Sequence, residues 1–459
     1  MTLQDYIDSI RHQSIAVIGI GVSNIPLLRL LCANGCKVTA CDRRSMAELG
    51  EVGRELEEAG CSFRLGEDYL EDLREELIFR TPGLMPFDPH LAAAVERGST
   101  LTSEMEVFLA LCPCRTFAVT GSDGKTTTTT IIAELLREQG YGVHLGGNIG
   151  KPLLCELPEI RPTDVAVLEL SSFQLHSMTC RPDVAVITNL SPNHLDKHKD
   201  FQDYMDAKAS IFRNQRPEDR LILNRDDPHT PYYRSLAHSR ISYFSDRSEI
   251  EEGCVCRDGR LYYVPEGADS ELLYAEEIRI PGEHNVQNYL AAFEAVRGWV
   301  SAETCRKVAK RFPGVPHRLE EVRVRRGVTW INDSMASSPT RTIVGLEASR
   351  KKPIVIVGGY DKHIPFDELG DRLNELAKTV ILCGDTAEKI RTAILNSRAW
   401  HGLPLETAED LQDAVRLADA CAEKGDIVML SPACASFDRF RNFEERGNLF
   451  KQYVRELEE

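Results

Sequence analysis

The chain has 459 residues, which at about 150 residues per domain suggests three domains rather than a single core. Its 55 lysines and arginines against 71 aspartates and glutamates give a formal net charge of −16, which disfavours a protein that coats nucleic acid or an anionic membrane. Hydrophobic residues at 42% and charged residues at 27% are typical of a globular protein and argue against disorder.

The sequence shows no signal peptide, no membrane helix and no Cys-x-x-Cys motif. The polar, acidic N-terminus is unlike a signal peptide, and no apolar run approaches the roughly 20 residues of a membrane helix. The 14 cysteines include no Cys-x-x-Cys pair, so we expect reduced, structural thiols. The sequence predicts a cytoplasmic protein without membrane insertion.

The first block of the chain opens with a buried strand at 15–20, followed by a glycine turn, a helix at 26–33 and a strand at 37–42 that ends on Asp42. This βαβ order predicts a parallel sheet with ligands at the carboxyl ends of its strands. Gly19-x-Gly21-x-x-Asn24 with Asp42 resembles a dinucleotide fingerprint but lacks its third glycine, so NAD is weakly supported. Asp42 could instead cap a helix.

The second block starts near Ser103 with a strand at 116–121, the segment Gly-Ser-Asp-Gly-Lys-Thr-Thr at 121–127, and a helix at 128–140. Further buried strands are expected at 165–170, 184–190 and 221–224. Short alternating strands follow from 239 to 280, with Asp258-Gly259 as a hairpin turn, and the helix after Gly282 closes the block.

The third block, from near Val315, alternates strands at 328–333, 353–359, 379–384 and 426–433 with amphipathic helices. We therefore expect an α/β protein of three domains, with sites in the clefts between them.

The segment 121–127 has the features of a phosphate-binding loop. Glycines let backbone N–H groups converge on phosphate oxygens, and the following helix presents its positive end to the same anion. Lys125 can reach the β- and γ-phosphates, and the Thr126 hydroxyl can bind Mg²⁺. The loop predicts ATP binding but leaves the reaction open among kinase, ATPase, GTPase and ligase.

Three other residues could complete such a site. Glu169 ends the next buried strand, where a carboxylate can hold Mg²⁺. His194 and His198 stand i,i+4, but the zincin pattern H-E-x-x-H is missing, so His194 is assigned to a second Mg²⁺ or the transferred phosphate and His198 to the surface. Lys208 lies on a predicted helix among small residues, and its sequence context alone predicts an ordinary solvated lysine.

These residues resemble a known family, the ATP-dependent Mur ligases of peptidoglycan synthesis, which share a three-domain plan with folylpolyglutamate synthase. The shared segments cover nearly the whole chain: the 121–127 loop, GNIG at 147–150, ELSSFQL at 169–175, NLSPNHLDKH at 189–198, AKASIF at 207–212, GEHNVQN at 282–288, PHRLE at 316–320 and NDSMASSPTRT at 332–342. Two more, at 358–366 and 430–450, resemble the branch that adds D-glutamate to UDP-N-acetylmuramoyl-L-alanine.

The resemblance implies a Rossmann-like domain at 1–103 that binds the UDP substrate, a central P-loop ATPase-like domain at 104–314 with a mostly parallel sheet, and a Rossmann-like domain at 315–459 that binds the incoming amino acid. It implies a monomer that uses ATP and two Mg²⁺ ions and forms an amide through an acyl phosphate. Hinge closure is expected near 312–315, because the phosphate loop lies in block two and the amino-acid pocket in block three.

Site residues follow from the same resemblance. Lys125, His194 and Lys208 are the expected catalytic residues, with Thr126, Glu169, His194 and carbamylated Lys208 around the metal. The expected ATP contacts are Gly121, Ser122, Asp123, Gly124, Lys125, Thr126, Thr127, Asn148, Asn285, Asn288, Arg318 and Asp333. The expected UDP-substrate contacts are Gly19, Gly21, Val22, Ser23, Asp42, Arg43, Thr81, Gly83 and Ser171, and the expected D-glutamate contacts are His194, Ser337, Lys362, Ser436 and Phe443.

The chain departs from the family pattern at Asp123, Asn193 and Met335, where the family often has asparagine, an acid and lysine. Asp123 adds negative charge near the triphosphate, so its side chain should point outward. Asn285 and Asn288 share a helix face, which suits paired adenine contacts, although asparagine also caps helices.

Alternatives remain at the level of function. A ligase for another amino acid, or a folylpolyglutamate synthase, would share the phosphate loop. Measuring which amino acid stimulates phosphate release from ATP would distinguish these functions. A regulatory protein with a dead site would lack turnover altogether. A dehydrogenase is disfavoured because the best nucleotide loop is Walker-like and lies in block two.

Overall fold

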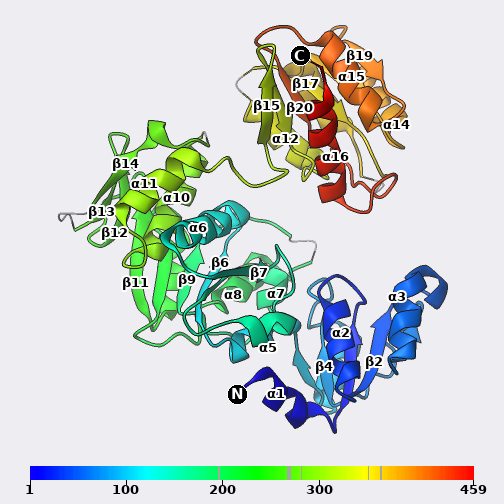
Figure 1. Ribbon diagram of the computed structural model, residues 1–459, viewed down its shortest axis with the longest axis vertical. Helices are drawn as coiled ribbons and strands as arrows, with labels where there is room; N and C mark the ends of the chain where they lie inside the picture. Colours follow the sequence, from blue (N-terminus) through cyan, green and yellow to red (C-terminus); the bar gives the residue numbers. More distant parts are fainter. Residues whose placement is uncertain (195–196, 266–269, 281, 350, 362–363, 459) are drawn as a thin grey trace. The chain divides into compact units, whose positions relative to one another are not determined.

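The computed structural model describes residues 1–194, 197–265, 270–280, 282–349, 351–361 and 364–458. The chain divides into two compact units, Met1–Phe312 and Pro313–Glu459. It builds three α/β sheets, two in the first unit and one in the second, which confirms the predicted fold class (Figure 1). The expected domain boundaries remain predictions. In the described part of the chain, no helix combines the length and apolar character that crossing a bilayer requires.

The first sheet has five parallel strands in the order β3-β2-β1-β4-β5. Its strands are β1 (Ser14–Ile18), β2 (Lys37–Asp42), β3 (Ser62–Leu65), β4 (Leu77–Phe79) and β5 (Thr100–Thr102). The helices of this part are α1 (Leu3–Ile10), α2 (Asn24–Ala33), α3 (Met46–Glu58), α4 (Pro89–Glu96) and α5 (Glu104–Leu111). The strand order reverses between β1 and β4, so the loops after these two strands flank the crevice where such sheets bind ligands.

The central sheet has nine strands in the order β14-β13-β12-β11-β10-β9-β6-β8-β7. Its strands are β6 (Arg115–Thr120), β7 (Val143–Gly147), β8 (Val165–Glu169), β9 (Val184–Ile187), β10 (Arg220–Asn224), β11 (Arg240–Ser245), β12 (Gly253–Arg257), β13 (Arg260–Val264) and β14 (Glu271–Tyr274). Among the described residues, the antiparallel pairs of this sheet are β12 with β13 and β13 with β14. Asp258 and Gly259, at φ of 49° and 75°, form the predicted hairpin turn between β12 and β13.

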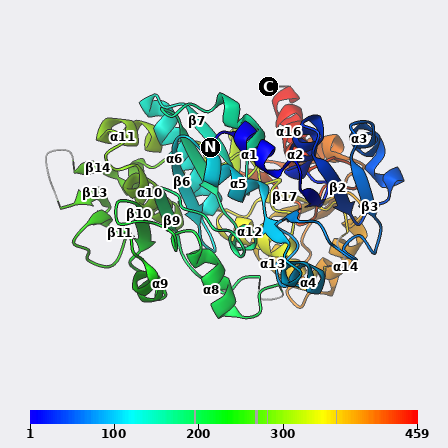
Figure 2. The same ribbon diagram turned by 90° about the horizontal axis from the view of Figure 1, so that it is seen from below.

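The helical segments of the central part are α6 (Lys125–Gln139), η1 (Leu154–Glu159), α7 (Ser172–Leu175), α8 (Phe201–Ala209), α9 (Thr230–Leu236), η2 (Ala275–Glu277), α10 (Glu283–Val296) and α11 (Ala302–Arg311). Helices α6 and α10 pack against each other and against the sheet, where Figures 1 and 2 draw them side by side. Helix α6 begins at Lys125 rather than at the expected Thr128, because the left-handed Gly124 is its N-cap.

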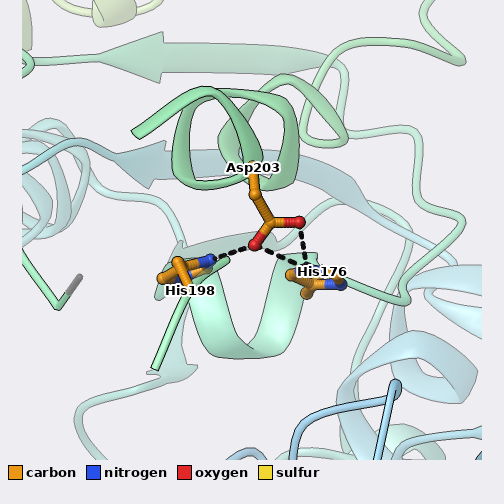
Figure 3. A group of neighbouring side chains, drawn as sticks. All are labelled: His176, His198 and Asp203. Carbon is orange, nitrogen blue, oxygen red and sulfur yellow. Dashed lines mark hydrogen bonds and ion pairs between the residues drawn. The ribbon is translucent and has the colours of Figure 1, made fainter. Parts of the chain in front are cut away.

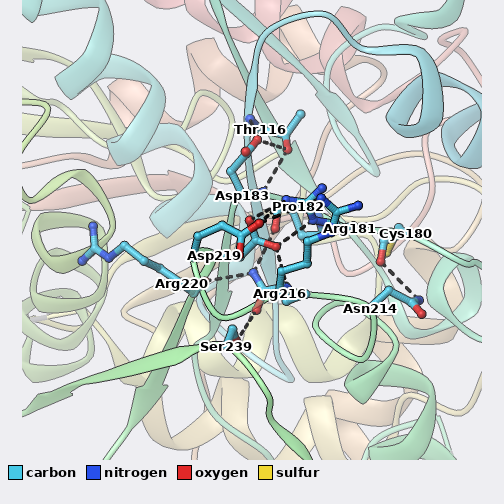
Figure 4. A network of polar contacts seen from close by, with 12 residues as sticks. Thr116, Cys180, Arg181, Pro182, Asp183, Asn214, Arg216, Asp219, Arg220 and Ser239 are labelled. Atoms are coloured by element: carbon cyan, nitrogen blue, oxygen red, sulfur yellow. Dashed lines mark hydrogen bonds and ion pairs between the residues drawn. The ribbon is translucent and has the colours of Figure 1, made fainter. Parts of the chain in front are cut away.

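A polar network ties together the amino ends of β6, β9 and β10 (Figure 4). Asp183, just before β9, accepts hydrogen bonds from the backbone and hydroxyl of Thr116 and pairs with Arg115 at 2.6 Å. Asp219, just before β10, accepts from the Arg181 guanidinium at 2.7 Å. These groups lie at the amino ends of the strands, opposite the carboxyl ends at which such sheets bind ligands.

The second unit holds a six-stranded sheet in the order β15-β16-β20-β17-β18-β19. In the part of the unit that the structure describes, β15 pairs antiparallel with β16 and the other pairs are parallel. Its strands are β15 (Glu320–Arg325), β16 (Val328–Asn332), β17 (Ile354–Val357), β18 (Thr379–Leu382), β19 (Leu405–Thr407) and β20 (Ile427–Leu430). Its helices are α12 (Pro339–Glu347), α13 (Asp367–Leu376), α14 (Ala387–Asn396), α15 (Leu411–Cys421) and α16 (Phe443–Glu456). The charged edge strand β15 was not predicted, because arginines and glutamates alternate with its valines.

Candidate active site

The phosphate loop lies between β6 and α6, at the carboxyl end of the central sheet. Gly121 and Gly124 have φ of 149° and 75°, which L side chains rarely adopt. A Cβ at Gly121 would collide with the Thr188 side chain, and one at Gly124 would collide with the Asn288 amide. Both glycines are therefore required by backbone conformation and by space.

The end of β9 holds this loop in place. The Asp123 N–H donates to Asn189 Oδ1 at 2.9 Å, and the Asp123 carbonyl accepts from Asn189 Nδ2 and from Thr188 Oγ1. These contacts end β9 at Ile187, short of the expected residue 190. The Asp123 side chain is exposed, as expected.

Lys125 is the first residue of α6, and its Nζ donates to the carbonyls of Gly121 at 3.0 Å and Ser122 at 2.8 Å. The ammonium is thus held over the loop where a phosphate would lie. Thr126 follows in the first turn and is half-buried, and Thr127 is buried.

Glu169 ends β8 and is buried, with 1% of its surface exposed. Its Oε1 accepts from the Asn148 amide at 2.7 Å, whereas its buried Oε2 has no hydrogen-bond partner. A buried carboxylate oxygen without a partner costs free energy unless a cation or donor binds it. The geometry therefore fits Glu169 to the predicted Mg²⁺ site. Asn148 orients this carboxylate, and its expected contact with adenine stays a prediction.

Lys208 is not an ordinary solvated lysine. It lies in the last turn of α8 with 1% of its surface exposed, and its Nζ donates to the Gly121 carbonyl at 2.7 Å and lies 4.4 Å from the centre of the Tyr204 ring. Burial, with Lys125 nearby, places the pKa of Lys208 well below its ordinary value. The neutral amine is therefore strongly favoured here compared with a surface lysine.

The two histidines of the 189–198 segment differ in their surroundings. His194 is exposed, has a φ of 56°, and its ring centre lies 4.9 Å from that of Phe173. His198 was predicted to lie at the surface, and that prediction is wrong: it is 3% exposed and bonded on both ring nitrogens. The sequence around His198 does not indicate that the side chain is buried, because its contact with Asp203 depends on how α8 packs in the folded chain.

The two asparagines of α10 lie beside the start of α6. Asn288 Oδ1 accepts from the Thr128 hydroxyl at 3.2 Å, and Asn288 Nδ2 donates to Asn285 Oδ1 at 3.2 Å. The contact between Asn288 and Thr128 thus joins α10 to the first turn of α6. A role in binding adenine stays a prediction.

In the first sheet, Asp42 closes the glycine turn after β1. Its Oδ2 accepts from the Ile20 N–H at 2.7 Å, and its carboxylate pairs with Arg44 at 2.9 Å. The helix-cap alternative is wrong, because Ser45 caps the following helix. Arg44 was not predicted, and the expected Arg43 pairs with Glu67 rather than with Asp42.

The remaining expected UDP contacts lie in the turns after β1 and β4 and at the start of α7. A Cβ on Gly19 would lie 3.2 Å from the Thr81 Cβ, so the turns after β1 and β4 are adjacent. Gly21, Val22, Ser23 and Gly83 are exposed, and Ser171 caps α7 through hydrogen bonds with Gln174.

Arg80 was missed by the sequence analysis and joins the first sheet to α7. It is 2% exposed, and its guanidinium donates to the carbonyls of Leu84 and Phe173, both at 2.7 Å, and to the Ser177 hydroxyl at 2.9 Å. A charged residue that directly follows a buried strand was the available signal. Burial lowers the pKa of Arg80 to about 10.

In the second unit, Asp333 follows β16 and is buried, which raises the pKa of its carboxyl to about 7. It accepts from the Ser431 hydroxyl at 2.8 Å. Arg318 is exposed, and Ser337 is half-buried. Lys362 lies outside the described residues.

Ser436 and Phe443 lie near a second arginine that was missed, Arg446. Arg446 is 3% exposed, and it donates to the carbonyls of Cys434 and Ala435, each at 3.1 Å, and to that of Ser334 at 2.9 Å. The turn before Ser436 is therefore fixed by a buried guanidinium. The arginine lies inside the specific segment 430–450 and could have been singled out there.

Comparison with known proteins matches both units. The Mur ligase middle domain matches residues 119–296, and the Mur ligase glutamate ligase domain matches residues 317–434. A protein of Acetivibrio thermocellus named UDP-N-acetylmuramoylalanine--D-glutamate ligase is 48% identical, and one of Clostridium perfringens with the same name is 45% identical. Each alignment covers 99% of this chain and 99% of the relative.

Solved structures are similar in fold. The UDP-N-acetylmuramate-alanine ligase MurC of Thermotoga maritima has a TM-score of 0.59 at 18% identity, covering 97% of this chain and 99% of that one. A MurF structure from Acinetobacter baumannii has a TM-score of 0.57 at 19% identity, with 97% and 92% covered. With its phosphate loop, buried lysine and strand-end carboxylate in one site, the chain belongs to the Mur ligase family and is a ligase.

Proposed function

We propose that the chain joins D-glutamate to UDP-N-acetylmuramoyl-L-alanine at the expense of ATP, giving ADP and phosphate. The observation that carries this proposal is the 48% identity, along the whole chain, to a protein that bears this name. A cytoplasmic location, a monomeric state and the absence of nucleic-acid partners stay predictions.

In the proposed reaction, a carboxylate oxygen of the substrate attacks the γ-phosphorus of ATP, and the bond from that phosphorus to the ADP oxygen breaks. The amine of D-glutamate then attacks the carbonyl carbon of the acyl phosphate, loses a proton, and phosphate leaves with the C–O bond electrons. Both reactants of the first step are anions, so the site must concentrate positive charge.

The residues of the chain supply that charge in specific places. Lys125, held over the loop by the Gly121 and Ser122 carbonyls, stabilises the transferring phosphoryl group, and the N-terminus of α6 points at the same anion. Glu169 and Thr126 would hold Mg²⁺, which when bound neutralises the triphosphate charge.

We propose further that Lys208 carries a carbamate. Its amine lies in a buried site that favours the neutral form, and a neutral amine is the form that adds to CO₂ with loss of a proton. The product is an anion and so could act as a metal ligand. Uptake of ¹³C-bicarbonate by the wild type, but not by Lys208→Ala, tests this directly by ¹³C NMR.

The function is tested by amide formation from UDP-N-acetylmuramoyl-L-alanine and ATP, with D-glutamate, L-glutamate, L-alanine or diaminopimelate as acceptor. We expect product and phosphate with D-glutamate alone. Product with another acceptor would assign the chain to another branch of the family, and no turnover with any of them would favour a regulatory protein.

A further inference from the structure

His176, His198 and Asp203 form a cluster beside the phosphate loop (Figure 3). His176 follows α7, His198 lies in the segment between β9 and α8, and Asp203 is in the first turn of α8. Asp203 Oδ2 lies 2.9 Å from His198 Nδ1, and Asp203 Oδ1 lies 2.9 Å from His176 Nε2. The carboxylate thus bridges two imidazoles that come from different segments.

The hydrogen bonds determine where the protons lie. An ionised carboxylate only accepts, so His198 donates from Nδ1 and His176 donates from Nε2. Although burial opposes it, these bonds hold the pKa of Asp203 below its ordinary value. With Nδ1 protonated, Nε2 of a neutral His198 is an acceptor, and the Ser172 hydroxyl donates to it at 3.0 Å.

A metal ion could in principle bind the same three side chains. Two ligands of one tetrahedral zinc ion lie about 3.3 Å apart, for bonds of about 2.0–2.1 Å. Both ring nitrogens are closer than this to the carboxylate, at 2.9 Å, and each is within hydrogen-bonding distance. The distances therefore favour a hydrogen-bonded network over a metal site.

The cluster is connected to the phosphate loop through α8. Tyr204, the residue after Asp203, packs its ring against His198 with centres 5.2 Å apart, and its hydroxyl lies 2.9 Å from Ser122 Oγ. One turn further along α8, Lys208 lies over the Tyr204 ring and donates to a loop carbonyl. The rotation of α8 about its axis therefore sets both contacts with the loop.

The cluster also reaches α7. The Phe173 ring stacks on His198, with centres 5.5 Å apart and 12° between the planes, and touches the ring of His194. Because Ser172 bonds to His198 as well, the start of α7 is fixed from two sides.

We propose that Asp203, acting through His198 and His176, is a positioning residue of the ligase: it fixes α8 against α7 so that Tyr204 and Lys208 meet the phosphate loop. This inference rests on the proposed function for its kinetic consequences. Neither the loop motif nor the metal ligands require an acid at position 203.

The test is Asp203→Asn, whose amide nitrogen cannot accept a hydrogen bond and so breaks one of the two histidine contacts. Mutation of residues that orient a functional side chain typically lowers activity about 10–100-fold. We therefore expect kcat to fall by about that factor, while KM for ATP stays within about twofold. Asp206→Asn, on the same helix and outside the cluster, is the matched control and should keep wild-type kcat. Asp203→Glu restores the carboxylate and should recover part of the loss.

A second measurement reports on the hydrogen bonds of the cluster and does not depend on enzymatic turnover. In protein labelled with ¹⁵N-histidine, the His198 signal, identified by its absence in His198→Gln, should show the Nδ1–H tautomer in the wild type and change in Asp203→Asn. The wild type should bind no stoichiometric Zn²⁺ at this cluster. Unchanged kcat in Asp203→Asn, an Nε2–H tautomer in the wild type, or tight Zn²⁺ binding that Asp203→Asn abolishes would each overturn the inference.

A wild type that does not use D-glutamate would refute the proposed function alone, since the tautomer and the ratio of rates with the true acceptor can still be measured.

Discussion

The pH dependence of stability should depend strongly on Glu104. This residue begins α5, is 6% exposed, and accepts from the Leu154 N–H at 2.8 Å. Burial raises the pKa of its carboxyl from 4.5 to about 7. Because the folded protein binds the proton more tightly than the unfolded chain, stabilisation by this group is complete below about pH 4.5 and lost as pH rises through about 7.

The magnitude follows from the size of the shift. A pKa raised from 4.5 to about 7 corresponds to about 3 kcal/mol in total, most of which falls between about pH 5 and pH 8. Glu104→Gln keeps the acceptor for Leu154 but cannot ionise. We therefore expect the free energy of unfolding of the variant, relative to the wild type, to increase by about 2–3 kcal/mol over that pH range.

The assay is equilibrium unfolding in urea at several pH values, with unfolding of the first unit followed by pulsed hydrogen exchange of the α5 peptide. Taking the difference between variant and wild type cancels the other titrating groups. Glu96→Gln, at an exposed position on α4, is the control for removal of a carboxylate from the same unit. A difference between Glu104→Gln and the wild type that does not change with pH would refute the assignment of a buried, protonated acid at this position.

Three further changes test the site. Gly121→Ala places a Cβ against Thr188, so ATP binding measured by calorimetry should weaken at least about tenfold, and unchanged affinity would contradict the loop geometry. Glu169→Gln removes the carboxylate proposed to bind Mg²⁺, so the Mg²⁺ concentration for half-maximal rate should rise while kcat falls about 100-fold or more; an unaltered Mg²⁺ titration would remove Glu169 from the metal site. Arg446→Lys cannot reproduce the forked hydrogen bonds that hold the turn before Ser436, so KM for D-glutamate should rise about tenfold with KM for ATP unchanged, and the opposite pattern would exclude this role.

Local patterns predicted much of the fold because strands and turns depend on nearby residues. The strand at 37–42 was predicted with its bounds, and the Asp258-Gly259 turn was found at the expected hairpin. Element ends were less accurate where a tertiary contact intervenes, as at β9, whose last expected residues turn to hold the phosphate loop.

The site could be predicted only in part. Its phosphate loop is a continuous segment, so its residues and its strand–turn–helix setting follow from sequence. Arg80 and Arg446 carried weaker signals, a charge at a strand end and a place inside a specific segment. Their role became clear only from the carbonyls of Phe173 and Ser334, which they bind across segments distant in the chain. The burial of His198 likewise depends on where α8 packs.

By itself, the sequence determined the class of chemistry: a glycine-rich turn with a lysine after a buried strand, whose backbone conformation is set by local residues. Only the tertiary structure decided which charges lose their water and which partners they gain. The pKa of Lys208 lies well below its ordinary value, and Glu169 has a buried oxygen without a partner, because the sheet and helices enclose both residues. Desolvation depends on the surrounding chain rather than on neighbours in sequence.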